Sequence, residues 1–193
     1  MRNAILIHGR PDKEEYFDTK YPSASNSHWF PWLSKQLLVN NVFAVVPEIP
    51  TPWMPRYEIW SRELERFDIT PETILVGHSC GGGFIVRWLS EHQDKRVDKV
   101  VLVAPWLNPE NNPKSDTADF FNFDIDPDLV KRTNGVTIFN SDNDKPTIHK
   151  SVQIIRDTIK GAHYREFHNY GHFCYEDMKT VEFPELLEEI LGK

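Results

Sequence analysis

The stretch Ile74-Leu75-Val76-Gly77-His78-Ser79-Cys80-Gly81-Gly82-Gly83-Phe84-Ile85-Val86 places one serine between two apolar segments. Four of the chain's nine glycines fall within positions 77–83. Small residues at the first and last positions of a G-x-S-x-G pattern let a strand turn sharply into a helix without Cβ clashes. Such a corner exposes the serine hydroxyl at the helix N-terminus, where unpaired N–H groups favour negative charge. The pattern therefore predicts that Ser79 is a nucleophile.

Two other interpretations of the same stretch are weaker. Ser79 could cap the helix while the glycines serve only close packing, or the loop could cradle a phosphate. The phosphate loop normally carries a lysine in G-x-x-x-x-G-K-[ST], and no lysine follows here. The segment 73–76 has the composition of a buried strand, and 84–89 has an apolar helical face. This context favours the nucleophile.

Composition limits the classes of protein to which the chain can belong. Its 193 residues, 39% hydrophobic and 12% aromatic, suit one folded domain, 1–193, with a substantial core. A formal net charge of −7 argues against nucleic acid or an anionic membrane as a partner. The first apolar run is too short for an export signal or a membrane span. With only Cys80 and Cys174, both expected as free thiols, we predict a cytoplasmic protein.

Short apolar runs alternate with segments of helical periodicity along the whole chain. The predicted strands are 4–8, 42–46, 73–76, 99–103, 136–140 and 164–167. The predicted helices are 28–39, 56–67, 81–91, 148–159 and 182–191. Alternation of this kind indicates right-handed crossovers and a parallel sheet covered by helices on both faces. We therefore predict the α/β class, with roughly six strands in the order 2-1-3-4-5-6.

One connection does not follow the alternation of predicted strands and helices. Residues 105–132 are rich in Pro, Asn and Asp, yet they include Phe120-Phe121-Asn122-Phe123. A connection this long with its own aromatic residues is typical of a functional loop or lid. The alternative is a surface excursion with a small core of its own.

A serine hydroxyl needs a base, and the base needs an acid that orients it. Of the eight histidines, His172 lies in a glycine-containing turn after the last predicted strand, at the sheet edge that should carry Ser79. His168 competes for this role, and His168-x-x-x-His172 also resembles metal-ligand spacing. That spacing requires a helix, which Gly171 disfavours, so we expect no metal and take His172 as the base.

The acid should follow the fifth predicted strand, where Asp142 and Asp144 both occur. Asp144-Lys145-Pro146 leads directly into the next predicted helix, and this favours Asp144, with Asp142 as a turn residue. Either aspartate could reach His172.

The oxyanion of an acyl-transfer intermediate needs two backbone donors already in place. One should be the N–H of Cys80, the residue after the nucleophile. The other should come from the turn after the first strand, where we expect Gly9 to make the turn and Arg10 to donate. In a doubly wound sheet, strands 1 and 3 are neighbours and their connections leave on opposite faces, so both donors border one crevice.

Taken together, these segments resemble the small serine hydrolases of the retinoblastoma-binding protein nine type, a branch of the α/β-hydrolase superfamily. The resemblance spans nearly the whole chain. It rests on His8-Gly9, 28–33, 47–50 with 58–60, Gly77–Gly81, 141–144 and 171–173. It implies a triad of Ser79, Asp144 and His172 that acts on small esters, thioesters or amides without a cofactor. The L-x-C-x-E motif is absent, so no retinoblastoma-type partner is expected.

The sequence thus predicts a serine hydrolase acting on a small-molecule acyl substrate. We expect aromatic side chains to wall its pocket, namely Trp29, Trp32, Trp53, Trp106, Phe120 and Phe121. A cysteine enzyme using Cys80 is a weak alternative, because a residue whose N–H faces the oxyanion points its side chain elsewhere. A non-catalytic binding module on the same scaffold is a stronger one, since a fold does not fix a function.

Overall fold

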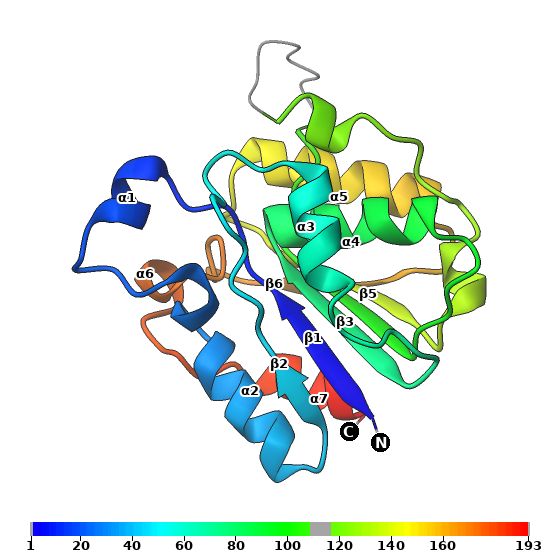
Figure 1. Cartoon of the computed structure of the whole chain (residues 1–193), viewed down its shortest axis with the longest axis horizontal. Helices are drawn as coiled ribbons and strands as arrows, with labels where there is room; N and C mark the ends of the chain where they lie inside the picture. The colour runs from blue at the N-terminus through cyan, green and yellow to red at the C-terminus, as the bar shows by residue number, and fades with distance from the viewer. Residues whose placement is uncertain (1, 109–116, 193) are drawn as a thin grey trace.

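The computed structural model describes residues 2–108 and 117–192. Its strands form one six-stranded sheet in the order β2-β1-β3-β4-β5-β6, and every neighbouring pair is parallel (Figure 1). The strands are β1 (Asn3–Ile7), β2 (Phe43–Val45), β3 (Thr73–His78), β4 (Lys99–Val103), β5 (Val136–Ser141) and β6 (His163–Phe167). The predicted α/β sheet and its strand order are confirmed.

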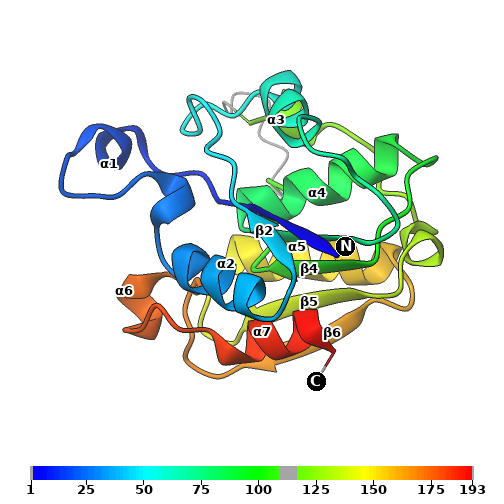
Figure 2. The ribbon, with the colours of Figure 1, turned by 60° about the horizontal axis from the view of Figure 1, so that its bottom comes forward.

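Helices cover both faces of this sheet, as predicted. They are α1 (Lys13–Phe17), α2 (Phe30–Val39), α3 (Tyr57–Leu64), α4 (Cys80–Glu91), α5 (Pro146–Thr158), α6 (Tyr175–Met178) and α7 (Pro184–Leu191). Short 3-10 turns lie at η1 (Ala24–Asn26), η2 (Asp119–Phe121) and η3 (Leu129–Arg132). Helices α2 and α7 pack on one face, and α3, α4 and α5 on the other (Figure 2). Across residues 2–108 and 117–192, none of these helices combines the length and apolar character needed to cross a membrane.

The centre of the core lies between β3 and α4. Every residue of β3 is buried, because helices cover both faces of the sheet at this strand. The apolar face of α4, with Phe84, Ile85, Trp88 and Leu89, is buried as well. Burying each such side chain contributes about 1.5–3 kcal/mol. The junction between β3 and α4 is therefore held on both sides by the best-packed part of the molecule.

The described ends of the long connection, residues 105–108 and 117–132, pack against α3 and α4. Residues 109–116 lie outside the described part of the chain. The lid predicted at 105–132 can therefore be compared with the structure only at its flanks, residues 105–108 and 117–132. Phe120 is buried, with its ring 5.2 Å from that of Trp60 and 6.2 Å from that of Phe84. Arg87 of α4 donates hydrogen bonds to the carbonyls of Asp119 and Phe120. The described flanks thus form a small aromatic core on α3 and α4.

The glycines around Ser79 are required by close approach. A Cβ on Gly77 would lie 2.6 Å from the carbonyl oxygen of Gly81, inside the corner. A Cβ on Gly81 would collide with the carbonyl oxygens of Ile7 and His8 at the end of β1. The missing side chains therefore let α4 begin directly against β1, as the sequence predicted.

We expect Gly81→Ala to lower the free energy of unfolding by about 2–3 kcal/mol, since neither carbonyl can retreat without distorting β1. Gly82→Ala is the matched control. Its Cβ would meet Pro105 Cβ at 3.0 Å, a tight contact that small shifts relieve. Urea unfolding followed by circular dichroism measures both, and equal losses in the two variants would contradict this explanation.

Candidate active site

Ser79 occupies the corner between β3 and α4 with φ 53° and ψ −119°. Such a backbone conformation is strained for any residue with a side chain and persists only when its surroundings impose it. Here the Ser79 N–H donates to the carbonyl of Val103 at 2.9 Å. The Ser79 carbonyl accepts from the N–H groups of Gly82, Gly83 and Trp106 at 3.0–3.2 Å. These bonds to β4, α4 and the following connection hold the strained corner.

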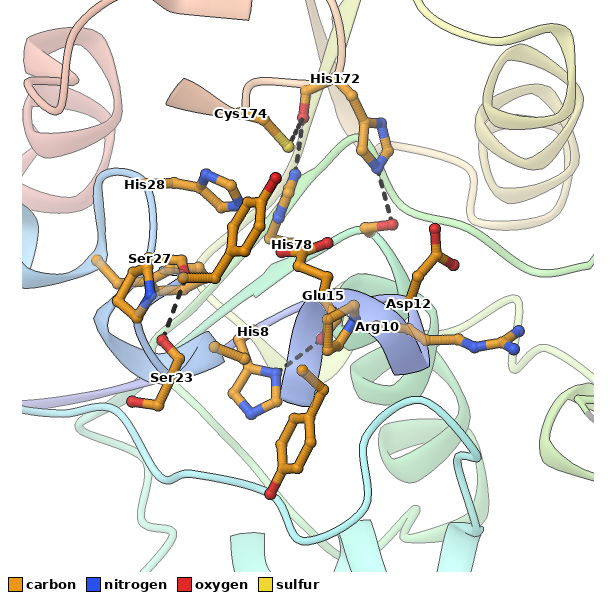
Figure 3. Close-up of a pocket in the computed structure, with 18 of the residues that line it drawn as sticks. His8, Arg10, Asp12, Glu15, Ser23, Ser27, His28, His78, His172 and Cys174 are labelled. Carbon is orange, nitrogen blue, oxygen red and sulfur yellow. Dashed lines mark hydrogen bonds between the residues drawn. The ribbon is translucent and has the colours of Figure 1, made fainter. Parts of the chain in front are cut away.

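The ring of the predicted base, His172, which is labelled in Figure 3, lies between the Ser79 hydroxyl and the predicted acid. The Oγ of Ser79 lies 2.9 Å from Nε2 of His172. On the other side of the ring, Nδ1 of His172 lies 2.8 Å from Oδ2 of Asp144. The Asp144 side chain is only 1% exposed, and that of His172 is 19% exposed. A buried carboxylate can only accept, so Nδ1 carries the proton and Nε2 is free to accept one from the serine.

Four consecutive residues at the carboxyl end of β5 hold the loop that carries His172. The side chains of Ser141, Asp142, Asn143 and Asp144 all bind this loop. The partners are Tyr170 N–H for Ser141, Asn169 N–H and the His168 ring for Asp142, Gly171 N–H for Asn143 and the His172 ring for Asp144. Both candidate aspartates therefore bind the loop, and only Asp144 reaches His172. Asp142 is an exposed turn residue whose carboxylate raises the pKa of His168 by hydrogen bonding.

Comparisons with known proteins agree with this geometry. The family described as "Serine hydrolase" matches residues 20–185. The chain belongs to the serine hydrolase family.

Relatives and solved structures extend the match over nearly the whole chain. YdeN of Bacillus subtilis (strain 168) is 30% identical over 178 residues, 89% of this chain and 91% of YdeN. Serine hydrolase RBBP9 of Rattus norvegicus is 24% identical over 165 residues, 84% of each chain. The crystal structure of the ydeN gene product from B. subtilis superposes with a TM-score of 0.81 at 25% identity, covering 100% of this chain and 98% of that one. The resemblance seen in the sequence is confirmed, and the chain is an esterase-like hydrolase.

The residues predicted to bind the oxyanion surround Ser79. A Cβ on Gly9 would lie 3.2 Å from Ser79 Cβ, so the turn after β1 touches the corner. Arg10 follows this turn, and its side chain is directed away, with Nε donating to the Trp53 carbonyl at 2.8 Å. Cys80 is the first residue of α4, and its thiol is buried in the core, which raises its pKa. The thiol is thus withdrawn from the site, while the main-chain N–H belongs to the first turn of the helix.

A cavity of about 670 Å³ opens above Ser79 and His172 (Figure 3). Segments 8–12, 15–16, 21–28 and 172–176 supply most of its lining. Four carboxylates line it, together with two cations. The carboxylates are Asp12, Glu15, Glu48 and Glu176, and the cations are Arg10 and Lys145. The serine hydrolase cavity is therefore polar and acidic in balance.

Most of the aromatic side chains predicted to wall the pocket lie elsewhere. Trp29 is fully buried, stacked on Phe30 at 4.1 Å between ring centroids. Trp53 packs against Tyr16, and it is Tyr16 that lines the cavity. Trp106, Phe120 and Phe121 belong to the aromatic packing on α4 and are not among the lining residues. The prediction went wrong because aromatic residues on an insertion served its packing, while residues 8–28 formed the wall.

Trp32 is the exception among these aromatic residues. It lines a second, smaller cavity that adjoins the first.

Several of the side chains that could hold a metal ion have partners within the described part of the protein. His168 and His172 do not face a common point, because their Nδ1 atoms bind different aspartates. His28, Cys174 and Glu176 bring donor atoms within 4.8 Å of one another. However, Nδ1 of His28 accepts the Tyr175 N–H at 3.1 Å, and the Cys174 thiol points to the His172 carbonyl at 3.7 Å.

Sequence reasoning missed His78, the residue before Ser79 in the G-x-S-x-G pattern. The His78 ring is fully buried, and Nε2 donates to the main-chain carbonyl of His172 at 2.8 Å. Burial lowers the pKa of His78 well below its usual value, and the nearby His172 lowers it further. The neutral ring therefore fixes the backbone of the proposed base. No local sequence signal shows this contact, because 94 residues separate the partners.

Replacing His78 by Phe keeps a ring in the core and leaves the His172 carbonyl with only the weak thiol donor of Cys174, which costs about 1–3 kcal/mol. We expect kcat for ester hydrolysis to fall about tenfold or more, with little change in KM, because the His172 ring loses its position. His78→Gln, which retains a donor, should recover part of the loss. A variant His78→Phe with wild-type kcat and an unchanged melting temperature would contradict this role.

Proposed function

We propose that the chain hydrolyses small esters, thioesters or amides through a Ser79–His172–Asp144 triad and an acyl-enzyme. The observation that carries this proposal is the 2.9 Å contact between Ser79 Oγ and His172 Nε2 at a strained, half-buried corner that lines the cavity. A base within hydrogen-bonding reach, itself oriented by a buried carboxylate, is what activates a serine.

In the proposed reaction, Ser79 Oγ attacks the carbonyl carbon while His172 Nε2 takes the hydroxyl proton. The carbonyl oxygen becomes an oxyanion, which the N–H groups of Cys80 and of Arg10 or Gly9 would stabilise. His172 then gives its proton to the leaving oxygen, sulfur or nitrogen, and the ester with Ser79 remains. His172 then takes a proton from water, whose oxygen attacks the carbonyl carbon of this ester; the bond to Ser79 Oγ breaks, His172 returns the proton to Oγ, and the acid is released. Asp144 keeps the imidazole oriented throughout and stabilises its charged form.

The substrate is expected to be a small molecule that fits the cavity of about 670 Å³. The acidic balance of this lining disfavours anionic compounds, nucleic acid included. We also propose that the enzyme acts in the cytoplasm; the free thiols of Cys80 and Cys174 are consistent with a reducing compartment.

A fluorophosphonate probe tests the mechanism, because it labels activated serines. We expect strong labelling of the wild type and its loss in Ser79→Ala and His172→Ala. Absence of labelling in a folded wild-type protein would overturn the proposal and favour a non-catalytic binding module.

The two aspartates supply a matched pair. Asp144→Asn should lower the labelling rate by about 10³-fold or more, because the amide cannot hold His172 in the required tautomer. Asp142→Asn should change it by less than about fivefold, since the side chain of Asp142 binds His168 and Asn169 and not the His172 ring. Equal losses in the two variants would mean that Asp144 acts by supporting the loop and not as the triad acid.

A further inference from the structure

A second cavity of about 370 Å³ adjoins the one that holds Ser79. The two cavities share a large part of their lining, namely Glu15, Tyr21, Pro22, Ser27, His28 and Glu176. A ligand whose reacting carbonyl lies at Ser79 can therefore extend past His28 into the second cavity. A space of about 150 Å³ already accommodates a benzene ring, so an aromatic or branched aliphatic group fits here.

Apolar side chains gather around this second cavity. Pro31 and Trp32 come from the first turn of α2, and Tyr175 and Val181 from the segment after His172. Tyr21, Tyr175 and Val181 are 49%, 50% and 45% exposed, although each is large and apolar. Exposed apolar residues that cluster on a concave surface mark a binding site more often than scattered ones do. Their exposure is explained if an apolar group of the substrate covers them.

The two walls of this cavity are tied together by adjacent residues. His28 accepts the N–H of Tyr175 at 3.1 Å through Nδ1, and Trp29 donates to the Phe173 carbonyl at 3.1 Å. His28 has φ 56°, a conformation uncommon for a residue with a side chain and one that marks a locally imposed geometry. The cavity is thus formed before any ligand binds, and one wall continues from the loop of His172. A group seated there has a fixed distance to the reacting centre.

Charged side chains that line both cavities restrict which ligands can extend from the first cavity into the second. Glu15 and Glu176 line both cavities. Asp12 and Glu176 lie close enough to Glu15 for their negative charges to act on it. The balance of charge at this point is negative, which opposes a substrate that carries a carboxylate or phosphate beyond the reacting carbonyl.

We propose that the second cavity is a substrate-binding subsite for an uncharged aromatic or aliphatic group, attached to the carbonyl that Ser79 attacks. This assignment rests on the proposed serine mechanism. It makes the preferred substrate an ester, thioester or amide with a polar centre and one apolar end. It also gives Trp32 a role in substrate binding, in place of the aromatic residues of the insertion.

Rates of phosphonylation of Ser79 test the subsite without knowledge of the natural substrate. The probes are ethyl ethylphosphonofluoridate and analogues that carry 4-phenylbutyl on the carbon or on the alkoxy side. Two further analogues carry 4-carboxybutyl, one on the carbon side and one on the alkoxy side. We expect at least one phenylbutyl probe to react about tenfold or more faster than the ethyl parent, and both carboxybutyl probes to react more slowly than the phenylbutyl ones. The side on which the gain appears shows whether the subsite holds the acyl or the leaving group.

Trp32→Ala and Tyr175→Ala should reduce the ratio of phenylbutyl to ethyl rates to within about threefold of unity. Tyr175 is half exposed, so its removal leaves the core intact and guards against misfolding as the cause. Leu38→Ala, an exposed apolar residue farther along α2, is the matched control and should keep the wild-type ratio.

A ratio near unity in the wild type, a ratio unaffected by both variants, or a faster carboxybutyl probe would overturn the subsite while leaving the serine mechanism intact. Failure of every probe to label the wild type would overturn both.

Discussion

The whole site depends on the backbone of one residue, Ser79, in a conformation that a residue with a side chain rarely adopts. Hydrogen bonds from β4, α4 and the connection after β4 hold that conformation, and the absence of a Cβ at Gly77 and Gly81 makes room for it. Because α4 begins directly against the end of β1, the turn at Gly9 and the start of α4 meet beside the serine hydroxyl. The strained backbone of Ser79 is thus a consequence of the strand order, which places β1 and β4 on either side of β3.

The second constraint lies on the opposite side of the hydroxyl. The side chains of Ser141–Asp144 hold the loop 168–172 by successive hydrogen bonds. In addition, the His78 ring donates a hydrogen bond to the main-chain carbonyl of His172. The proposed base is therefore held by its ring, by its carbonyl and by the loop on which it lies. Such support reduces the reorganisation needed when charge develops on the imidazole. The 94 residues between His78 and His172 make this a contact that only the folded sheet can create.

The sequence predicted what local patterns determine, including the six strands, their order and the residues that meet at Ser79. Asp144 was favoured over Asp142 because it leads into a helix, and the contacts agree. The walls of the cavity could not be predicted in the same way, because they come from residues 8–28, which lack strong periodicity. Phe120 and Phe121 do not line the cavity as predicted, since aromatic residues in an insertion fill a small separate core as readily as a pocket. His78 was missed because its partner is distant in sequence.

The most direct test is a crystal structure of the protein after reaction with a fluorophosphonate. The phosphorus should be bonded to Ser79 Oγ, with the phosphoryl oxygen about 3 Å from the N–H of Cys80 and from that of Arg10 or Gly9. This result would establish the nucleophile and its oxyanion donors together. Phosphorus on another residue, or a phosphoryl oxygen that contacts neither donor, would contradict the claim that the strained corner is a catalytic device.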